Sequence, residues 1–210
     1  MNIRTKKILA LLKKDYSKVQ CALNHRNPHE LLIATILSAQ CTDERVNIVT
    51  EKLFKKYKTI KDFAKANLKE FEKEIYSTGF YKNKAKNIIA TCNILQKKHK
   101  SKVPQNFDEL LHLPGVARKT ANCVMGNAFN VSSGVVVDTH VSRITQRLGL
   151  TKNSDPVKIE KDLIKELPKN EWIMFSHRLI WHGRKICDAR KPKCEICSLK
   201  KLCPSALYKI

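Results

Sequence analysis

The chain has 210 residues, 42% of them hydrophobic, which is enough for one large domain or two small ones and excludes a disordered protein. Its 41 Lys and Arg outweigh 19 Asp and Glu to give a formal net charge of +22, so a polyanion such as nucleic acid is the expected partner. The longest apolar stretch, residues 31–37, is too short to cross a bilayer. Residues 1–14 also lack the apolar core of a signal peptide, and we therefore expect a cytoplasmic protein with no membrane partner.

Nearly every segment shows the apolar spacing of a helix, and the expected fold class is all-α. Residues 29–40 are apolar almost all round, which indicates a central buried helix. The one strand-like run is residues 135–137, Val-Val-Val. We predict helices over residues 3–16, 29–40, 43–57, 61–66, 68–77, 81–98, 106–113, 119–129, 139–148, 156–167 and 172–181.

The most informative local pattern joins two of these helices, in the run Leu-Pro-Gly-Val-Ala-Arg-Lys-Thr-Ala-Asn at residues 113–122. Gly115 permits backbone angles that other residues avoid, and Val116 is expected to point inward between the helices. Main-chain N–H groups at the start of the second helix would then point outward, where they bind a phosphate oxygen. This is the helix–hairpin–helix pattern for holding a DNA backbone, although an ordinary helix–helix corner would have a similar sequence.

Lys119 lies just after this turn. In so basic a chain, a surface lysine beside DNA usually contacts a phosphate. A lysine beside an apolar wall and a cationic neighbour such as Arg118 can instead be uncharged, because burial and like charge both disfavour the ammonium form. The free amine is a nucleophile for carbon and forms Schiff bases.

Asp138 ends the apolar run of residues 135–137 and precedes a predicted helix. Asp is a preferred N-cap residue, and we expect this structural role. An ionised carboxylate at that position can also assist proton transfer and stabilise a sugar cation. His140 is a weaker candidate, for which packing or hydrogen bonding is the simpler role.

Four of the eight cysteines lie close together near the C-terminus, separated by six, two and five residues. Disulfides are not expected in an intracellular chain. Structural zinc sites usually have two close Cys-x-x-Cys pairs, whereas only Cys194 and Cys197 form one here. The alternative that we favour is an iron–sulfur cluster, although the spacing alone does not exclude zinc. The candidate ligands are Cys187, Cys194, Cys197 and Cys203.

The hairpin motif, the Val-Asp-Thr-His at residues 137–140 and the cysteine spacing together resemble the endonuclease III family of helix–hairpin–helix DNA glycosylases and AP lyases. The resemblance extends from residue 30 to Cys203. It implies a two-lobed fold: a six-helix lobe of residues 20–132 with the hairpin, and a second helical lobe of residues 1–19 plus 133–210 with a 4Fe–4S cluster. It also implies that Lys119 and Asp138 are catalytic and face each other across the cleft between the lobes, and that the four cysteines hold the cluster.

The resemblance further implies which residues bind DNA. Gln40 matches a residue that fills the gap left by an extruded nucleotide, and Phe80 lies where relatives often have a leucine wedge. Ala117 replaces a second glycine of the hairpin, and its methyl group is expected to restrict the backbone and slightly weaken the phosphate grip. The remaining DNA-binding candidates are Gly115 of the hairpin and the cations Arg184 and Lys191 near the cysteines.

The expected function is base excision repair by a monomeric enzyme acting on double-stranded DNA with damaged bases or abasic sites. It would remove oxidised or damaged pyrimidines and cleave the strand by β-elimination through a lysine Schiff base. An adenine-mismatch glycosylase has a similar scaffold, but typically lacks this lysine and has an additional C-terminal domain beyond the position of Ile210. A non-catalytic, metal-stapled DNA-binding module is the second alternative, and it would need neither Lys119 nor Asp138.

Overall fold

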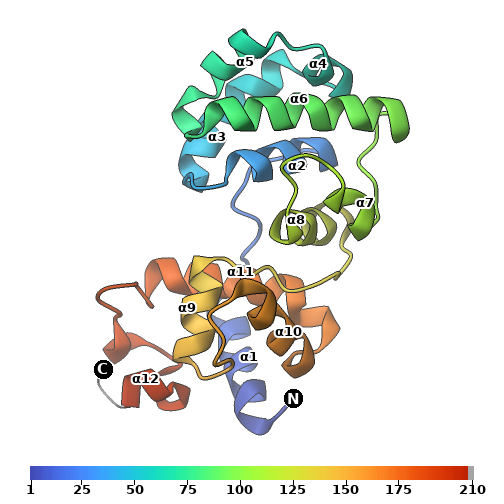
Figure 1. The fold of residues 1–210 in the computed structure, drawn as a ribbon. Coiled ribbons are helices and arrows are strands. Elements are labelled where there is room, and N and C mark those ends of the chain that lie inside the picture. The colour runs from blue at the N-terminus through green and yellow to red at the C-terminus, as the bar shows by residue number, and fades with distance from the viewer. Residues whose placement is uncertain (208–210) are drawn as a thin grey trace. The chain divides into compact units, whose positions relative to one another are not determined.

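The computed structural model describes residues 1–207, and their regular structure is entirely helical (Figure 1). None of these helices is both long and apolar enough to span a membrane. Short 3-10 helices lie at η1 (Tyr76–Thr78), η2 (Lys169–Glu171), η3 (Cys194–Ile196) and η4 (Lys200–Leu202). The α-helices are α1 (Ile3–Asp15), α2 (Pro28–Leu37), α3 (Asp43–Lys56), α4 (Ile60–Ala64), α5 (Leu68–Glu74), α6 (Tyr81–Lys98), α7 (Phe107–Leu111), α8 (Arg118–Phe129), α9 (Thr139–Arg147), α10 (Pro156–Glu166), α11 (Trp172–Lys185) and α12 (Pro204–Leu207).

Polar side chains fix where most of the longer helices begin. Asn27 accepts a hydrogen bond from the backbone N–H of Glu30, and Pro28 follows it at the first position of α2, where no N–H is needed. Thr42 caps α3 and Asp155 caps α10 in the same way. These caps satisfy N–H groups that have no partner inside the helix.

The chain divides into two compact units. We call residues Cys21–Val131 the hairpin unit, and Met1–Gln20 together with the chain from Ser132 onward the cysteine unit. Each unit has a buried apolar cluster of its own. Each is therefore stabilised by its own core.

In the hairpin unit, α2 is the central helix. Residues 30–37 are all buried, which confirms the prediction from the sequence. Around it pack α3, α6 and α8, while α4 and α5 pack on α6. The rings of Phe63, Tyr57 and Phe71 contact one another at centroid distances of 5.1–6.0 Å and fill the end of this core.

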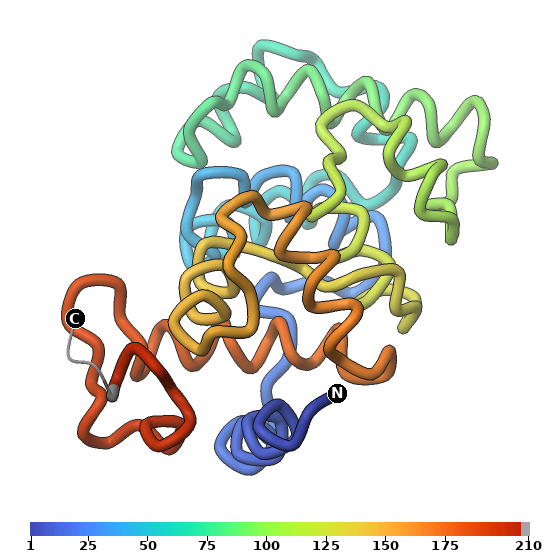
Figure 2. The backbone as a smooth tube through the Cα atoms, turned by 60° about the horizontal axis from the view of Figure 1, so that its bottom comes forward, coloured from blue at the N-terminus to red at the C-terminus, as the bar shows by residue number. Residues whose placement is uncertain are grey.

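In the cysteine unit, α1 packs on α11 although the two are far apart in the sequence, as the blue and orange segments of Figure 2 show. Helix α9 also packs on α11, and Gly183 makes this close approach possible. A Cβ atom at Gly183 would lie 2.7 Å from Cδ2 of His140 and 3.0 Å from Cδ1 of Ile144.

An ion pair network joins α1 to α11. The Glu171 carboxylate is 2.6 Å from Nζ of Lys13 and 2.8 Å from Nη1 of Arg178, and the side chains of Glu171 and Arg178 are each 10% exposed. Burial alone would raise the pKa of Glu171, but Lys13 and Arg178 outweigh it and the pKa is lowered. The carboxylate is therefore charged at neutral pH and compensates the buried guanidinium.

Replacing Glu171 by Gln is expected to lower the free energy of unfolding by about 3 kcal/mol at pH 7, because Arg178 is left buried without a counter-charge. In the wild type, Glu171 is protonated and loses this contribution as the pH falls through its lowered pKa. The difference in the free energy of unfolding between the wild type and Glu171→Gln should therefore become smaller in acid. Urea unfolding between pH 3 and 7 measures both effects. The control is Glu51→Gln, which removes an exposed pair with Lys55 and should change little. Equal losses in the two variants would contradict a stabilising role for the buried pair.

The strand-like run of residues 135–137 forms no strand in the described chain, as the all-α prediction requires, and Val135 and Val137 are buried in the core of the cysteine unit. The corrections to the sequence predictions concern helix ends. Helix α2 ends at Leu37 rather than at Gln40, whose φ of 53° is left-handed. Helix α11 continues to Lys185, one turn beyond the predicted end, and delivers the chain directly to Cys187.

Candidate active site and cysteine loop

The hairpin between α7 and α8 has the predicted construction. Gly115 has a φ of +77°, and a Cβ atom there would lie 3.0 Å from the side chain of Asn87. Val116 is 7% exposed, which confirms that it points inward. The Thr91 hydroxyl of α6 donates to the Pro114 carbonyl at 2.8 Å and fixes the turn to the rest of the unit.

The start of α8 is suited to bind an anion. Its N-cap residue is Ala117, which has no side-chain acceptor, so no cap hydrogen bond is made there. The first N–H groups of this 12-residue helix combine with its dipole to attract a phosphate. With φ −92° and ψ 171°, the backbone at Ala117 is ordinary extended chain, so the methyl group adds no strain.

Lys119 is the second residue of α8 and is exposed. Arg118 adjoins it, and the Arg118 guanidinium lies 5.1 Å from the centre of the Phe107 ring of α7. A cation–π contact of this kind orients the guanidinium across the hairpin. Lys119 therefore lies beside the hairpin turn, and the guanidinium of its neighbour Arg118 is held against the Phe107 ring.

Asp138 caps α9, as predicted. Its Oδ1 accepts from the backbone N–H of Val141 at 2.8 Å, and its Oδ2 lies 3.1 Å from Nδ1 of His140. The side chain is 16% exposed. These two contacts fix the orientation of the Asp138 carboxylate, which is still partly exposed to solvent. His140 has the hydrogen-bonding role that we expected.

Gln40 and Phe80 have the same unusual backbone conformation. Both are exposed, Phe80 to 64%, and both are non-glycine residues with a left-handed φ, of 53° and 48° respectively. Such conformations cost energy and are common at functional sites. Phe80 directly precedes α6, and Gln40 lies in the short connection between α2 and α3.

Lys84 was missed by the sequence analysis and links the segments that carry these two residues. It is only 5% exposed, and its ammonium donates to the carbonyls of Leu37 and Thr78, both at 2.8 Å. Burial lowers its pKa. Leu37 ends α2 just before Gln40, and Thr78 lies two residues before Phe80. The position of Lys84 in an amphipathic helix gave no signal, because a lysine there is usually on the solvent side.

Replacing Lys84 by Met should leave two buried carbonyls without a donor and lower the free energy of unfolding by about 1–3 kcal/mol. Because the segments carrying Gln40 and Phe80 loosen, excision of an intact damaged base should fall more than cleavage at a preformed abasic site. Parallel assays on the two duplexes measure this ratio. Lys86→Met, on the exposed side of the same helix, is the matched control. A ratio equal to that of the control would show that Lys84 is only structural.

The four clustered cysteines lie at the turns of one loop. Cys187 follows α11, Cys194 begins η3, Cys197 directly follows η3, and Cys203 follows η4. Three of them pack against the core of the cysteine unit. Burial raises the pKa of Cys197, and the negative charges of the other three cysteines raise it further. Four thiolates in this volume therefore need a positive group to compensate them.

Side chains from α9 and α11 surround these sulfurs. Nη1 of Arg147 is 3.3 Å from Sγ of Cys187, and the same guanidinium donates at 2.7 Å to the carbonyls of Asp188 and Ala189. Nε2 of His182 lies 3.6 Å from Sγ of Cys197, while its Nδ1 lies 3.0 Å from the hydroxyl of Tyr16. Second-shell hydrogen bonds of this kind orient metal ligands.

The other two predicted DNA contacts are surface cations of the cysteine unit. Arg184 is exposed near the end of α11, and Lys191 is exposed in the cysteine loop. The Asp188 carboxylate accepts from the backbone N–H groups of Arg190 and Lys191, which lower its pKa and fix this turn. The predicted residues thus fall into two sets: Gln40, Phe80, Gly115, Ala117 and Lys119 in the hairpin unit, and Asp138, Arg184, Lys191 and the four cysteines in the cysteine unit.

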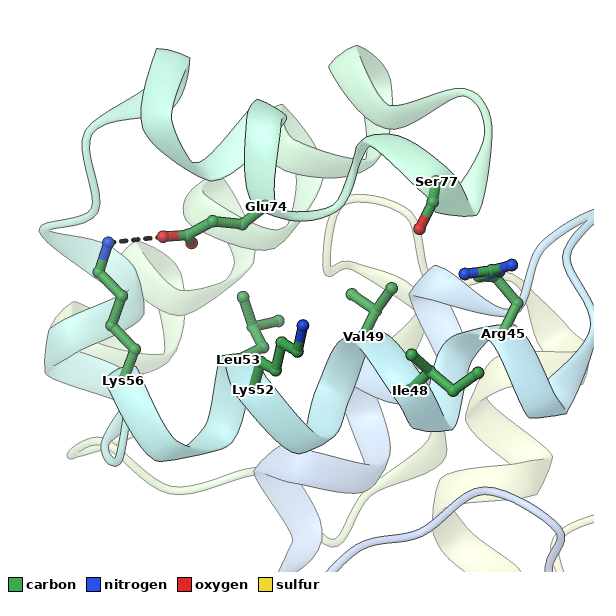
Figure 3. A pocket seen from close by; sticks show the side chains of 8 residues that line it. All are labelled: Arg45, Ile48, Val49, Lys52, Leu53, Lys56, Glu74 and Ser77. Atoms are coloured by element: carbon green, nitrogen blue, oxygen red, sulfur yellow. Dashed lines mark hydrogen bonds and ion pairs between the residues drawn. The ribbon is translucent and has the colours of Figure 1, made fainter.

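A separate pocket of about 320 Å³ lies between α3 and the segment from Glu74 to Ser77 (Figure 3). Its floor is apolar and its edge is basic, with Lys56 paired to Glu74. None of the predicted catalytic residues lines it. The lining residues are Arg45, Ile48, Val49, Lys52, Leu53, Lys56, Glu74 and Ser77.

Known proteins resemble the chain throughout its length. Residues 33–169 match the HhH-GPD superfamily of base excision DNA repair proteins, and residues 187–203 match the iron–sulfur binding domain of endonuclease III. Endonuclease III of Synechocystis sp. is 53% identical over 97% of this chain and 93% of its own. That of Bacillus subtilis is 46% identical over 90% and 86%. The structure of a non-covalent endonuclease III–DNA complex superposes with a TM-score of 0.93 at 44% identity, covering 100% of this chain and 99% of the other. A trapped covalent endonuclease III–DNA intermediate matches with the same values.

The hairpin, the all-helical fold and the iron–sulfur segment define a base excision repair protein of the HhH-GPD superfamily. Within that superfamily, the chain belongs to the endonuclease III family. It is an enzyme that combines DNA glycosylase and AP lyase activity, it acts on DNA, and its cofactor is a 4Fe–4S cluster.

The residues of the cysteine loop fit that cofactor. The loop offers four cysteine sulfurs, the ligand set that a 4Fe–4S cluster takes. Arg147 and His182 contact two of these sulfurs and would orient them as ligands.

Proposed function

We propose that this enzyme excises damaged pyrimidine bases from duplex DNA, with Lys119 as nucleophile and Asp138 as the assisting carboxylate. The observation that carries the proposal is the position of Lys119, exposed at the second residue of α8 beside the uncapped helix start. A phosphate bound at that helix start would place the neighbouring deoxyribose within reach of the amine.

The chemistry requires the uncharged amine of Lys119. Its Nζ attacks C1′ of the sugar, the C1′–N bond breaks, and the base leaves with a proton. Asp138 stabilises the developing positive charge on the sugar and accepts a proton from the attacking amine. The sugar ring then opens: the C1′–O4′ bond breaks, O4′ takes up the proton that Asp138 accepted, and a protonated Schiff base forms between Nζ and C1′. The Schiff base acidifies the C2′ proton, and removal of that proton breaks the C3′–O3′ bond and expels the 3′ phosphate by β-elimination.

We propose that Gln40 and Phe80 occupy the space that the extruded nucleotide leaves in the helix. Their exposure and left-handed backbone support this role, since such a conformation is kept where it serves a function. Extrusion costs a few kcal/mol, and less for a poorly stacked damaged base. Gly115 and the start of α8 would hold the DNA backbone, and Arg184 and Lys191 would add contacts to its phosphates. Because these contacts are electrostatic, DNA binding should weaken steeply as the salt concentration rises.

We assign the cluster to Cys187, Cys194, Cys197 and Cys203. When bound, it supplies cohesion to a loop with little apolar content and compensates the charge of the four thiolates. Arg147 and His182 hold two of these sulfurs in place, and the fixed loop presents Lys191 to the DNA. Because the relatives named above are bacterial, we also propose that the enzyme works on the chromosome in the cytoplasm.

A substrate panel tests the proposal. Duplexes carrying an oxidised pyrimidine, an oxidised purine, an adenine mismatch or a plain abasic site are incubated with the enzyme and borohydride. We expect trapped adducts with the oxidised pyrimidine and the abasic site, and much less with the other two. Preferred processing of the adenine mismatch, without a trapped adduct, would instead support the adenine-mismatch glycosylase.

A further inference from the structure

The ring of His140 lies between the Asp138 carboxylate and helix α11. Its Nδ1 is 3.1 Å from Oδ2 of Asp138, and because an ionised carboxylate can only accept, Nδ1 donates this hydrogen bond. Another edge of the same ring faces α11, since a Cβ atom at Gly183 would lie 2.7 Å from Cδ2 of His140. The imidazole is therefore held on two sides, by an acceptor and by a helix.

Gly183 has no local reason to be a glycine. It is a buried residue of α11, and its φ is not left-handed, unlike that of the glycines that commonly end helices. Glycine within a helix is less favourable than alanine, so a packing reason is needed. The nearest obstacle to a methyl group is the rigid ring of His140, whereas the ends of the flexible Ile144 and Arg143 side chains lie at 3.0 and 3.1 Å.

Both oxygens of the Asp138 carboxylate have a hydrogen-bond donor. Oδ1 accepts from the backbone N–H of Val141 at 2.8 Å, which ties one oxygen to the start of α9. This cap alone would leave the second oxygen free to turn about the bond between Cβ and Cγ. The hydrogen bond from His140 opposes that rotation. A reacting group that is held in its productive orientation before the reaction lowers the barrier.

On the basis of the role proposed above for Asp138 in base excision, we propose that His140 is a positioning residue for its carboxylate. Gly183 provides the space in which the imidazole is held. His140 acts through Asp138 and not on the sugar: it keeps Oδ2 in place, while Asp138 stabilises the sugar cation and accepts the proton.

A direct contact with a DNA phosphate is the other role open to an imidazole at this position. The structure favours positioning, because Nδ1 is already engaged with Asp138, the Cδ2 edge faces α11, and the side chain is only 27% exposed. The two roles change different quantities. Loss of a phosphate contact weakens DNA binding, whereas loss of a positioning contact slows the bound complex.

Single-turnover excision of an oxidised pyrimidine by the cluster-loaded enzyme tests the proposal, with the DNA dissociation constant measured in parallel. His140→Leu and His140→Asn are a matched pair, because the two side chains have the same branching and only asparagine has an N–H donor. His140→Leu should slow excision at saturating enzyme by about 10–100-fold and change the dissociation constant by less than about 2-fold. His140→Asn should retain the wild-type rate to within about 3-fold.

Gly183→Ala disturbs the same contact while both His140 and Asp138 stay in place. Its methyl group would displace the imidazole, so excision should slow about as much as in His140→Leu. In the double variant with His140→Leu, the contact is already lost, and the rate should fall by less than about 2-fold further. Urea unfolding and the visible absorbance of the cluster show whether each variant is folded. Gly183→Ala decides the question if His140→Leu folds poorly.

The Asp138→Asn background distinguishes failure of this proposal from failure of the proposed function. There, His140→Leu should change the excision rate by less than about 2-fold, because His140 acts only through the carboxylate. If Asp138→Asn excises as fast as the wild type, the proposed role of Asp138 itself is wrong. If Asp138→Asn is slow, the positioning role is overturned by a His140→Leu variant that keeps the wild-type rate, slows both backgrounds equally or only weakens DNA binding.

Discussion

Lys119→Gln should abolish the borohydride-trapped adduct with DNA and slow strand cleavage at least about 1,000-fold. The amide of glutamine is not a nucleophile toward C1′, and it cannot form the Schiff base that makes the C2′ proton acidic. The side chain is exposed, so the fold should be unchanged. The rate of adduct formation on a preformed abasic site measures the effect directly, because that substrate requires no base excision.

Lys69→Gln is the matched control for this variant. Lys69 is also exposed, and it is also the second residue of a helix, α5, in the same unit. Both variants lose one positive charge, so their DNA affinities should fall by similar, small factors at a fixed salt concentration. Adduct formation that persists undiminished in Lys119→Gln would show that another amine is the nucleophile.

The sequence predicted a helix well where the apolar side chains of the helix pack against a single core. Helix α2 is the clearest case, because residues that are apolar all round have only the centre of a domain in which to be buried. Helix ends were predicted less well, because the apolar pattern continues past the point where the backbone leaves the helix. The prediction carried α2 to Gln40, but the helix ends at Leu37 and Gln40 has a left-handed φ of 53°.

The site was predictable as far as its residues form local motifs. The inward position of Val116 and the cap at Asp138 depend on a few neighbouring residues and are confirmed. Lys84 joins segments that are distant in the sequence, because it donates to the carbonyls of Leu37 and Thr78. Single residues of common type carry no signal of such contacts, because the fold alone decides which of them meet.

Asp138→Asn should separate the structural role of this residue from its chemical role. Asparagine caps helices as well as aspartate does, and its amide oxygen can still accept from the backbone N–H of Val141. We therefore expect the free energy of unfolding to change by less than about 0.5 kcal/mol. Without a charge to stabilise the sugar cation or a basic oxygen to take a proton, base excision should slow by about 10²–10⁴.

Asp155→Asn is the matched control for Asp138→Asn. Asp155 caps α10 in the same unit, where its carboxylate accepts from the backbone N–H of Lys158 at 2.9 Å. Both variants lose one negative charge at a helix start. Any effect of that loss on the helix dipole or on the cap should therefore be similar in the two proteins, and a difference in activity reports on the reaction. Excision of an oxidised pyrimidine and cleavage of an abasic site are then measured for both proteins. If the two variants retain the same activity, Asp138 is a helix cap only, and the carboxylate that assists Lys119 must be another residue.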